Sequence, residues 1–206
     1  MNTIETTRNI FVGVDIQNDF VDGSLAVNEG EEVIAPANKI AAAVRESGGQ
    51  AVWTRDWHPA STPHFNNWPV HCVADSDGAV FHPDLAVTSN DVVLSKGTEQ
   101  TDGYSGWEGV GPNGETLETI IAPNRDRVRV FIGGLATDYC VKATALDIAE
   151  HFKDEPRVSA YLIRDAVRAV ELNAGDGQAA LDAMNEAKVL AISSEQAVHM
   201  IEETAK

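Results

Sequence analysis

Short apolar runs alternate with helix-like patterns along most of the chain. Residues 10–14 form the first apolar run, and apolar side chains then recur at helical spacing between residues 33 and 44. A continuous apolar run suits a strand buried on both faces, whereas spacing of three and four suits a helix with one apolar face. The pattern predicts strands over residues 10–14, 51–54, 92–94, 128–132, 158–163 and 189–192, with helices over 33–44, 116–122, 138–152 and 177–185 and a terminal helix.

This alternation predicts one α/β domain that spans residues 1–206. Strands that alternate with helices are joined by right-handed crossovers, which makes the sheet mostly parallel and places helices on both of its faces. We therefore expect a single domain with a six-stranded, mostly parallel sheet. Such sheets bind ligands beyond the carboxyl ends of their strands, so polar residues at those ends are the first candidates for chemistry.

Residues 56–90 break the alternation. The segment is rich in His, Pro, Trp, Asn and Asp and shows no sustained period. Loops of this length in compact domains are usually either functional or disordered. The prolines and aromatic residues favour an ordered, functional loop.

Composition narrows the choice of partners. The chain has 15 Lys and Arg against 32 Asp and Glu, a formal net charge of -17. Phosphate-rich partners need clustered cations, so we expect no nucleic-acid and no membrane partner. Residues 1–9 are polar, and no stretch reaches the roughly 20 apolar residues of a membrane span. Two cysteines are too few for a disulfide scaffold, which predicts a cytoplasmic protein with reduced thiols. A homo-oligomeric state is left open.

The first candidate segment, residues 15–20, directly follows the first predicted strand. A carboxylate such as Asp15 at the end of a buried strand lies near apolar walls, which raise its pKa and suit it to general-base work. Asn and Asp also cap turns through their own side chains. From this segment alone, both interpretations stay open.

The second candidate segment, residues 133–140, predicts a strand, a tight glycine turn and the start of a helix. With Thr137 as N-cap, Cys140 falls in the first helical turn. Unpaired backbone N–H groups there favour a thiolate and can bind an oxyanion. A lone cysteine on a helix is more often a buried structural residue, but the glycine-led helix start favours a nucleophile.

The irregular loop carries four candidate metal ligands, Asp56, His58, His64 and His71. Positions two apart in an extended chain point the same way, so Asp56 and His58 can bind one ion. Carboxylate and imidazole together suit Zn, Fe(II) or Mn. The alternative is that these histidines only satisfy hydrogen bonds of the loop. Lys96 follows the third predicted strand, where it can reach into the site and pair with Asp15. From this residue alone, an exposed, solvated lysine is the simpler interpretation.

Five motifs follow one another along the chain. They are Asp15-x-Gln17-Asn18-Asp19-Phe20, Arg55-Asp56-Trp57-His58-Pro59, Trp68-Pro69-Val70-His71-Cys72, Lys96-Gly97 and Gly133 to Cys140. In this order they resemble the motifs of nicotinamidases, which are amidases of the isochorismatase-like (cysteine hydrolase) superfamily. The resemblance runs from about residue 9 to residue 194.

The resemblance implies an isochorismatase-like fold and a role for each motif. It implies a catalytic triad of Asp15, Lys96 and Cys140. A cis peptide would fall at Leu135–Ala136, with the Ala136 and Cys140 N–H groups as oxyanion donors. One divalent metal ion, zinc first and iron or manganese as alternatives, would be held by Asp56, His58 and His71, with His64 as a fourth ligand. The implied substrate-binding residues are Phe20, Trp68, Tyr104 and Leu135.

The activity implied by the resemblance is hydrolysis of nicotinamide to nicotinate and ammonia through a cysteine thioester, with the metal orienting the pyridine ring. A rival is a related cysteine amidohydrolase for carbamoyl or ureido substrates, which generally lacks the metal cluster. Isochorismatase itself is disfavoured because Cys140 occupies the nucleophile's position. A noncatalytic binding protein on the same fold would predict a damaged triad. The intact triad and the candidate ligands Asp56, His58 and His71 favour a nicotinamidase.

Overall fold

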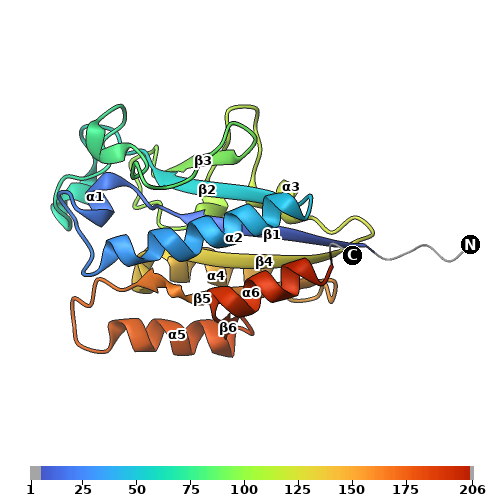
Figure 1. Cartoon of the computed structure of the whole chain (residues 1–206). Helices are drawn as coiled ribbons and strands as arrows, with labels where there is room; N and C mark the ends of the chain where they lie inside the picture. The colour runs from blue at the N-terminus through green and yellow to red at the C-terminus, as the bar shows by residue number, and fades with distance from the viewer. Residues whose placement is uncertain (1–5, 205–206) are drawn as a thin grey trace, which may run out of the picture.

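All six strands of the sheet are parallel. The computed structural model describes residues 6–204, and the strands lie in the order β3-β2-β1-β4-β5-β6 (Figure 1). Their bounds are β1 (Thr7–Val14), β2 (Gln50–Asp56), β3 (Val92–Lys96), β4 (Arg127–Leu135), β5 (Val158–Arg168) and β6 (Leu190–Ile192). The predicted single α/β domain with a six-stranded parallel sheet is confirmed.

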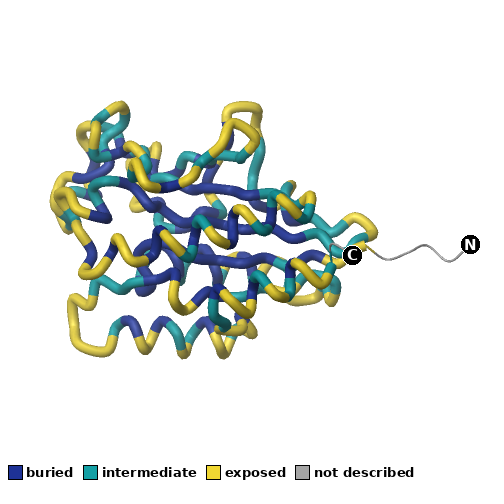
Figure 2. Tube along the Cα trace, in the orientation of Figure 1, coloured by how far each residue is buried: buried dark blue, intermediate teal, exposed yellow. Residues whose placement is uncertain are grey.

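Helices enclose the sheet on both faces. One face carries α2 (Ile34–Glu46) and α6 (Ser194–Glu202), and the other carries α3 (Leu117–Ile121), α4 (Lys142–His151) and α5 (Asp176–Glu186). Successive side chains of a strand point to opposite faces, so in β1 Phe11 packs in the core under α2, while Ile10 and Val12 pack in the core under α4. Figure 2 shows the result, a buried sheet between helices whose outer sides are exposed.

The structure differs from the predicted elements mainly at their ends and in the loops. β5 continues past Ile163 to Arg168, and its register with β4 shifts between Ile132 and Gly134. The long loop holds two short 3-10 turns, η2 (Pro63–Asn66) and η3 (Asp77–Ala79), and a further short helix, α1 (Asn18–Val21), follows β1. Elements of one turn are too short to show a periodic pattern, which is why none of them was predicted.

The direction in which strands are added reverses at β1. From β1 the chain moves outward through β2 to β3, and it then returns to build β4, β5 and β6 on the other side of β1. The crevice beyond the carboxyl ends of β1 and β4 is therefore the expected ligand site of such a sheet. Within residues 6–204, no helix is long and apolar enough to cross a membrane.

Candidate active site and metal-binding site

Asp15 is the first residue beyond β1 and lies fully buried at the reversal point of the sheet. Its backbone adopts φ 49°, a left-handed conformation that Asp tolerates better than most residues. Thr54 Oγ1 donates a hydrogen bond to Asp15 Oδ1 at 2.6 Å. Burial raises the pKa of Asp15 above its ordinary value, the neighbouring Lys96 acts in the opposite direction, and Asp56 adds to the increase. A carboxyl group whose pKa is raised in this way accepts a proton more readily than an exposed one, as a general base must.

Lys96 is the last residue of β3, and its ammonium group joins the polar groups of the site. Nζ lies 2.8 Å from Asp15 Oδ2, 2.5 Å from Asp56 Oδ1 and 3.5 Å from Cys140 Sγ. Asp56 and Lys96 are direct neighbours in the β2–β3 register. Burial lowers the pKa of Lys96, but the two carboxylates outweigh it and hold the pKa well above its ordinary value. The lysine is therefore charged and paired in the interior.

Cys140 faces the same cluster from the segment after β4. This segment begins with a π-helical turn, η5 (Thr137–Val141), and continues into α4. The turn is closed by a hydrogen bond from the Val141 N–H to the carbonyl of Ala136, five residues back. Ala136 is accordingly the N-cap, so the prediction of Thr137 as N-cap was wrong by one residue. The Leu135–Ala136 peptide bond is cis.

The pKa of the Cys140 thiol moves in the direction opposite to the one expected from a helix start. Burial raises it well above its ordinary value, Lys96 lowers it, and the Asp15 and Asp56 carboxylates raise it further. One ligand atom each of Asp15, Asp56 and Cys140 lies within 4.8 Å of the other two. In this arrangement Cys140 is thus a thiol next to a carboxylate that can accept its proton.

Three histidines of the long loop converge beside this cluster. His58, His64 and His71 are buried, and one ring nitrogen of each lies within 4.8 Å of the others. Each Nδ1 already has an oxygen partner: the Gly97 carbonyl at 3.0 Å for His58, an Asp102 carboxylate oxygen at 2.7 Å for His64, and the Pro69 carbonyl at 2.7 Å for His71. Such partners fix the ring so that Nε2 is the free ligand atom.

These residues fit a divalent metal ion. Among the described residues 6–204, the buried Nε2 of His58 has no hydrogen-bond partner, which is costly unless another group binds it. Burial lowers the pKa of His71 and favours its neutral, metal-binding form. Asp56 Oδ2 lies 3.5 Å from His58 Nε2 and 3.9 Å from His71 Nε2, so a carboxylate completes the set of donors. Three imidazoles and a carboxylate are a common ligand set for zinc and related ions.

Gln17 holds Asp56 in place from the motif after β1. Its side-chain amide accepts a hydrogen bond from the Asp56 N–H and donates to the Asp56 carbonyl, both at 2.8 Å. Gly97 is needed for a different reason, because its φ is +63° and an added Cβ would lie 2.5 Å from the ring of His58. These contacts explain why polar and glycine residues surround the four candidate ligands.

A small cavity of about 20 Å³ opens between the cysteine and the histidines. Of the predicted substrate-binding residues, Phe20, Trp68 and Tyr104 line this cavity, and so does Ala136. Leu135 does not line it and is fully buried in the core.

Sequence reasoning missed three residues of the cavity wall, Leu25, Tyr139 and Val170. Val170 is held there because the buried Asp138 carboxylate accepts hydrogen bonds from the N–H groups of Val170 and Glu171, at 2.9 and 3.0 Å. Asp138 lies in the predicted motif, but its partners come from a distant segment with no pattern of its own.

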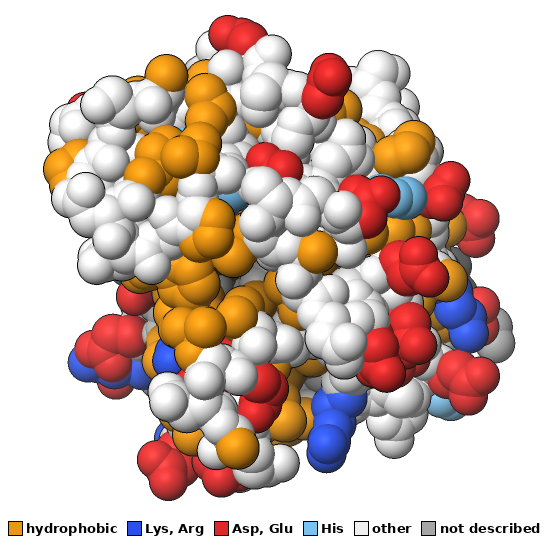
Figure 3. Space-filling model, turned by 90° about the vertical axis from the view of Figure 1, so that its left-hand side faces the viewer, with side chains coloured by type: hydrophobic (Ala, Val, Ile, Leu, Met, Phe, Trp, Pro, Cys, Tyr) orange, Lys and Arg blue, Asp and Glu red, His pale blue; other side chains and the backbone are white. Residues whose placement is uncertain are grey.

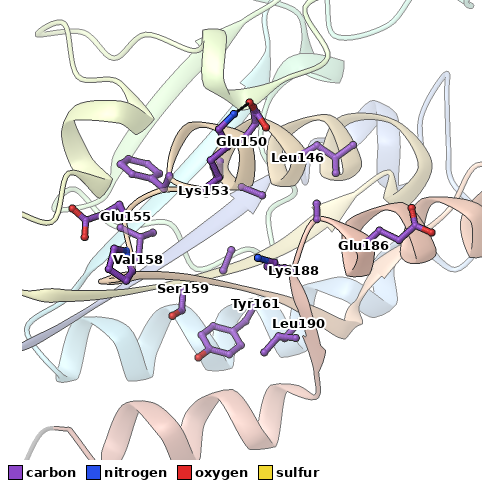
Figure 4. Close-up of a pocket in the computed structure, with 16 residues that line it drawn as sticks. Leu146, Glu150, Lys153, Glu155, Val158, Ser159, Tyr161, Glu186, Lys188 and Leu190 are labelled. Carbon is purple, nitrogen blue, oxygen red and sulfur yellow. Dashed lines mark hydrogen bonds and ion pairs between the residues drawn. The ribbon is translucent and has the colours of Figure 1, made fainter.

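The face that carries this site gathers hydrophobic side chains, with acidic side chains concentrated toward one side (Figure 3). A much wider groove of about 600 Å³ lies elsewhere, between the last turns of α4 and α5 and the start of β5 (Figure 4). None of the predicted site residues lines that groove, and its Glu150 and Lys153 pair with each other. The chemistry is therefore concentrated at the small cavity.

Comparisons with known proteins agree with the fold and the site described above. The isochorismatase domain model matches residues 9–196. The nicotinamidase/pyrazinamidase of Mycobacterium tuberculosis is 40% identical over 144 residues, which cover 65% of this chain and 75% of that protein. The crystal structure of pyrazinamidase of Pyrococcus horikoshii in complex with zinc has a TM-score of 0.77 and 35% identity, covering 90% of this chain and 99% of that one. PnC1 from L. infantum in complex with nicotinate has a TM-score of 0.75 and 31% identity, covering 94% and 96%.

Proposed function

This chain belongs to the isochorismatase family, and on that premise we propose that it is a nicotinamidase, which hydrolyses nicotinamide to nicotinate and ammonia. The observation that carries the proposal is one buried cluster in which Asp15, Lys96 and Cys140 lie beside the three converging histidines. A triad suits hydrolysis through a covalent intermediate. Similar proteins named nicotinamidase/pyrazinamidase, and one solved with nicotinate, support the choice of substrate.

In the first half-reaction Asp15 accepts the proton of the Cys140 thiol, and the sulfur attacks the carboxamide carbon. The carbonyl oxygen becomes an oxyanion, for which the N–H groups of Ala136 and Cys140 are the donors. Asp15 then returns the proton to the amide nitrogen as the C–N bond breaks. Ammonia leaves, and the acyl group remains on Cys140 as a thioester.

In the second half-reaction Asp15 accepts a proton from water, and the resulting hydroxide attacks the thioester carbon. The C–S bond breaks, the proton passes from Asp15 to the sulfur, and the carboxylic acid is released as nicotinate. Lys96 stays charged throughout, because it is paired with Asp15 and Asp56 at 2.8 and 2.5 Å. Its role is to hold Asp15 in place and to limit the rise of its pKa.

The metal would be held by Asp56, His58, His64 and His71, with zinc as the first choice and iron or manganese as alternatives. The zinc in the similar archaeal pyrazinamidase supports this choice. When bound, a divalent ion supplies a Lewis acid that can bind the ring nitrogen and so orient the substrate. Phe20 and Trp68 would then contact the faces of the ring, since both line the cavity.

The direct test is ammonia release from nicotinamide by the purified protein, compared with Cys140→Ala and Cys72→Ala. Cys72 is the matched control, because it is equally buried but its sulfur faces the Gly78 carbonyl outside the cavity. We expect release by the parent and by Cys72→Ala but none by Cys140→Ala. If a folded, zinc-loaded parent released no ammonia from nicotinamide but hydrolysed a ureido substrate, the chain would instead be assigned to the carbamoyl amidohydrolases.

A further inference from the structure

Two tyrosines separate the cavity beside Cys140 from a second, open hollow. The inner cavity has a volume of about 20 Å³, whereas the outer hollow has about 450 Å³. Tyr104 and Tyr139 line both spaces, and they are the residues that the two linings share. The outer hollow continues over Lys142 and along α5 past Ala179 and Ala183. The two rings are thus the partition between the nucleophile and this hollow.

The inner cavity is too small for the substrate while the partition is in place. A volume of about 20 Å³ has room for about one water molecule, and a pyridine carboxamide is several times larger. At least one wall must therefore move before a ring can reach Cys140. The walls on the side of the metal ligands are buried, whereas the two tyrosines of the partition also face the outer hollow, which gives them open space to move into.

Of the two tyrosines, Tyr139 is held less firmly. The Tyr104 hydroxyl accepts a hydrogen bond from Trp68 Nε1 at 2.9 Å. Within residues 6–204 the Tyr139 hydroxyl has no hydrogen-bond partner. Its ring makes an edge contact with the ring of Trp68, with centroids 4.8 Å apart, and a tilted contact with the ring of Tyr104, with centroids 5.7 Å apart. Beyond the area that they bury, aromatic contacts of this kind contribute only about 0.5–1.5 kcal/mol each, so the ring of Tyr139 is held less firmly than that of Tyr104.

We propose that Tyr139 is the gate and the size filter of the reaction pocket. Its ring turns toward the outer hollow to admit the substrate and then closes against Trp68 and Tyr104 over a single aromatic ring. Carboxamides of one six-membered ring fit behind the closed gate, whereas bicyclic aromatic carboxamides keep it open and react poorly. The substrate side of this inference rests on the proposed amidase function.

The kinetic test compares Tyr139→Ala with Tyr139→Phe. Both variants and the parent are assayed with nicotinamide and with quinoline-3-carboxamide, and the ratio of the two kcat/KM values is measured. Tyr139→Ala removes the ring, so the ratio should shift toward the bicyclic amide by roughly ten-fold or more. Tyr139→Phe keeps the ring and loses only an unpaired hydroxyl, so its ratio should stay near that of the parent. An unchanged ratio in folded Tyr139→Ala overturns the proposal, and Tyr139→Leu replaces the alanine variant if the latter does not fold.

A second readout does not depend on hydrolysis. The rate at which Cys140 is alkylated by iodoacetamide and by a bulky N-aryl iodoacetamide is followed by peptide mass spectrometry, which separates Cys140 from Cys72. The parent should discriminate strongly against the bulky reagent, and Tyr139→Ala should lose that discrimination. If the parent hydrolyses no amide but shows this pattern, the gate stands and the nicotinamidase proposal fails. Equal discrimination by the parent and by Tyr139→Ala removes the gate, whatever the substrate is.

Discussion

Replacement of Lys96 by methionine tests whether the buried cluster is held together by charge. Methionine keeps most of the length of the lysine side chain but removes the ammonium group, whose Nζ lies 2.8 Å from Asp15 and 2.5 Å from Asp56. Both carboxylates are almost completely shielded from water. We therefore expect a large loss of activity together with a pH-dependent loss of stability.

The expected loss of folding stability follows from two independent limits. Removal of one partner from a buried ion pair costs about 3–5 kcal/mol. Alternatively the orphaned carboxyl group can bind a proton, and from an ordinary pKa of 3.8 this costs about 4 kcal/mol at pH 7. Because the pKa of Asp15 is already raised in the parent, the second figure is an upper limit, and Lys96→Met should lose about 3–4 kcal/mol at pH 7. Because the same proton blocks Asp15 as a base, kcat should fall by about 10²–10⁴-fold.

The pH dependence gives the sharper test. In the variant the pKa of Asp15 rises further above its unfolded value, so the folded state holds a proton that the unfolded state releases. The deficit is absent below about pH 4 and grows as pH rises, by at most about 1.4 kcal/mol per pH unit. Urea unfolding of both proteins in EDTA, from pH 4 to pH 8, measures it, and Lys39→Met on the exposed face of α2 is the control. A deficit that does not change with pH, or a fully active variant, would refute the ionic interpretation.

Three further outcomes are expected. Asp102→Asn removes the carboxylate that contacts His64 Nδ1, so zinc binding should weaken about 10–100-fold in a competition titration. Asp84→Asn is the control, because its carboxylate lies outside the metal cluster, and it should leave zinc binding unchanged. Removal of the metal with a chelator should raise KM for nicotinamide sharply and be reversed by added zinc; an unchanged KM would remove the orienting role. Burial raises the pKa of Asp91, but its hydrogen bonds, first of all from Arg45, lower the pKa below its ordinary value overall. Asp91→Asn should therefore cost about 1–3 kcal/mol at pH 7, and the difference from the parent in urea unfolding should shrink as pH falls below about 4 and through the lowered pKa of Asp91.

The sheet and the chemical groups of the site were predictable from local patterns. The inner strands β1, β2 and β4 are mostly buried on both faces, so each left an apolar run, and polar residues such as Asp15 and Lys96 marked the ends of two of the strands. Since the carboxyl ends of parallel strands meet at one edge of the sheet, residues 81 positions apart in sequence are brought to 2.8 Å. The histidines were identified because four candidate ligands lie close together in one irregular loop.

Other features had no local signal. Tyr139 and Val170 reach the cavity only because η5 and the segment after β5 meet there, held by the Asp138 carboxylate. The pKa of Cys140 depends on burial and on carboxylates from two other strands, so a helix start in the sequence indicated the wrong direction. The helix also begins with a bond spanning five residues, from Val141 to Ala136, which sequence preferences for N-caps do not anticipate.

Asp56 links the two halves of the site and makes them electrically dependent on each other. Its Oδ1 lies 2.5 Å from Lys96, and its Oδ2 faces His58 and His71 at 3.5 and 3.9 Å. With Asp15 and Asp56 ionised and Lys96 protonated, the cluster carries a formal charge of -1 in the interior, which is unfavourable without compensation. A divalent cation held by the histidines would offset that charge and bind the orphaned Nε2 of His58. The Asp56 carboxylate contacts both Lys96 and the histidines. A change in the metal ligands must therefore also alter the electrostatic field at Asp15, where the proton is exchanged.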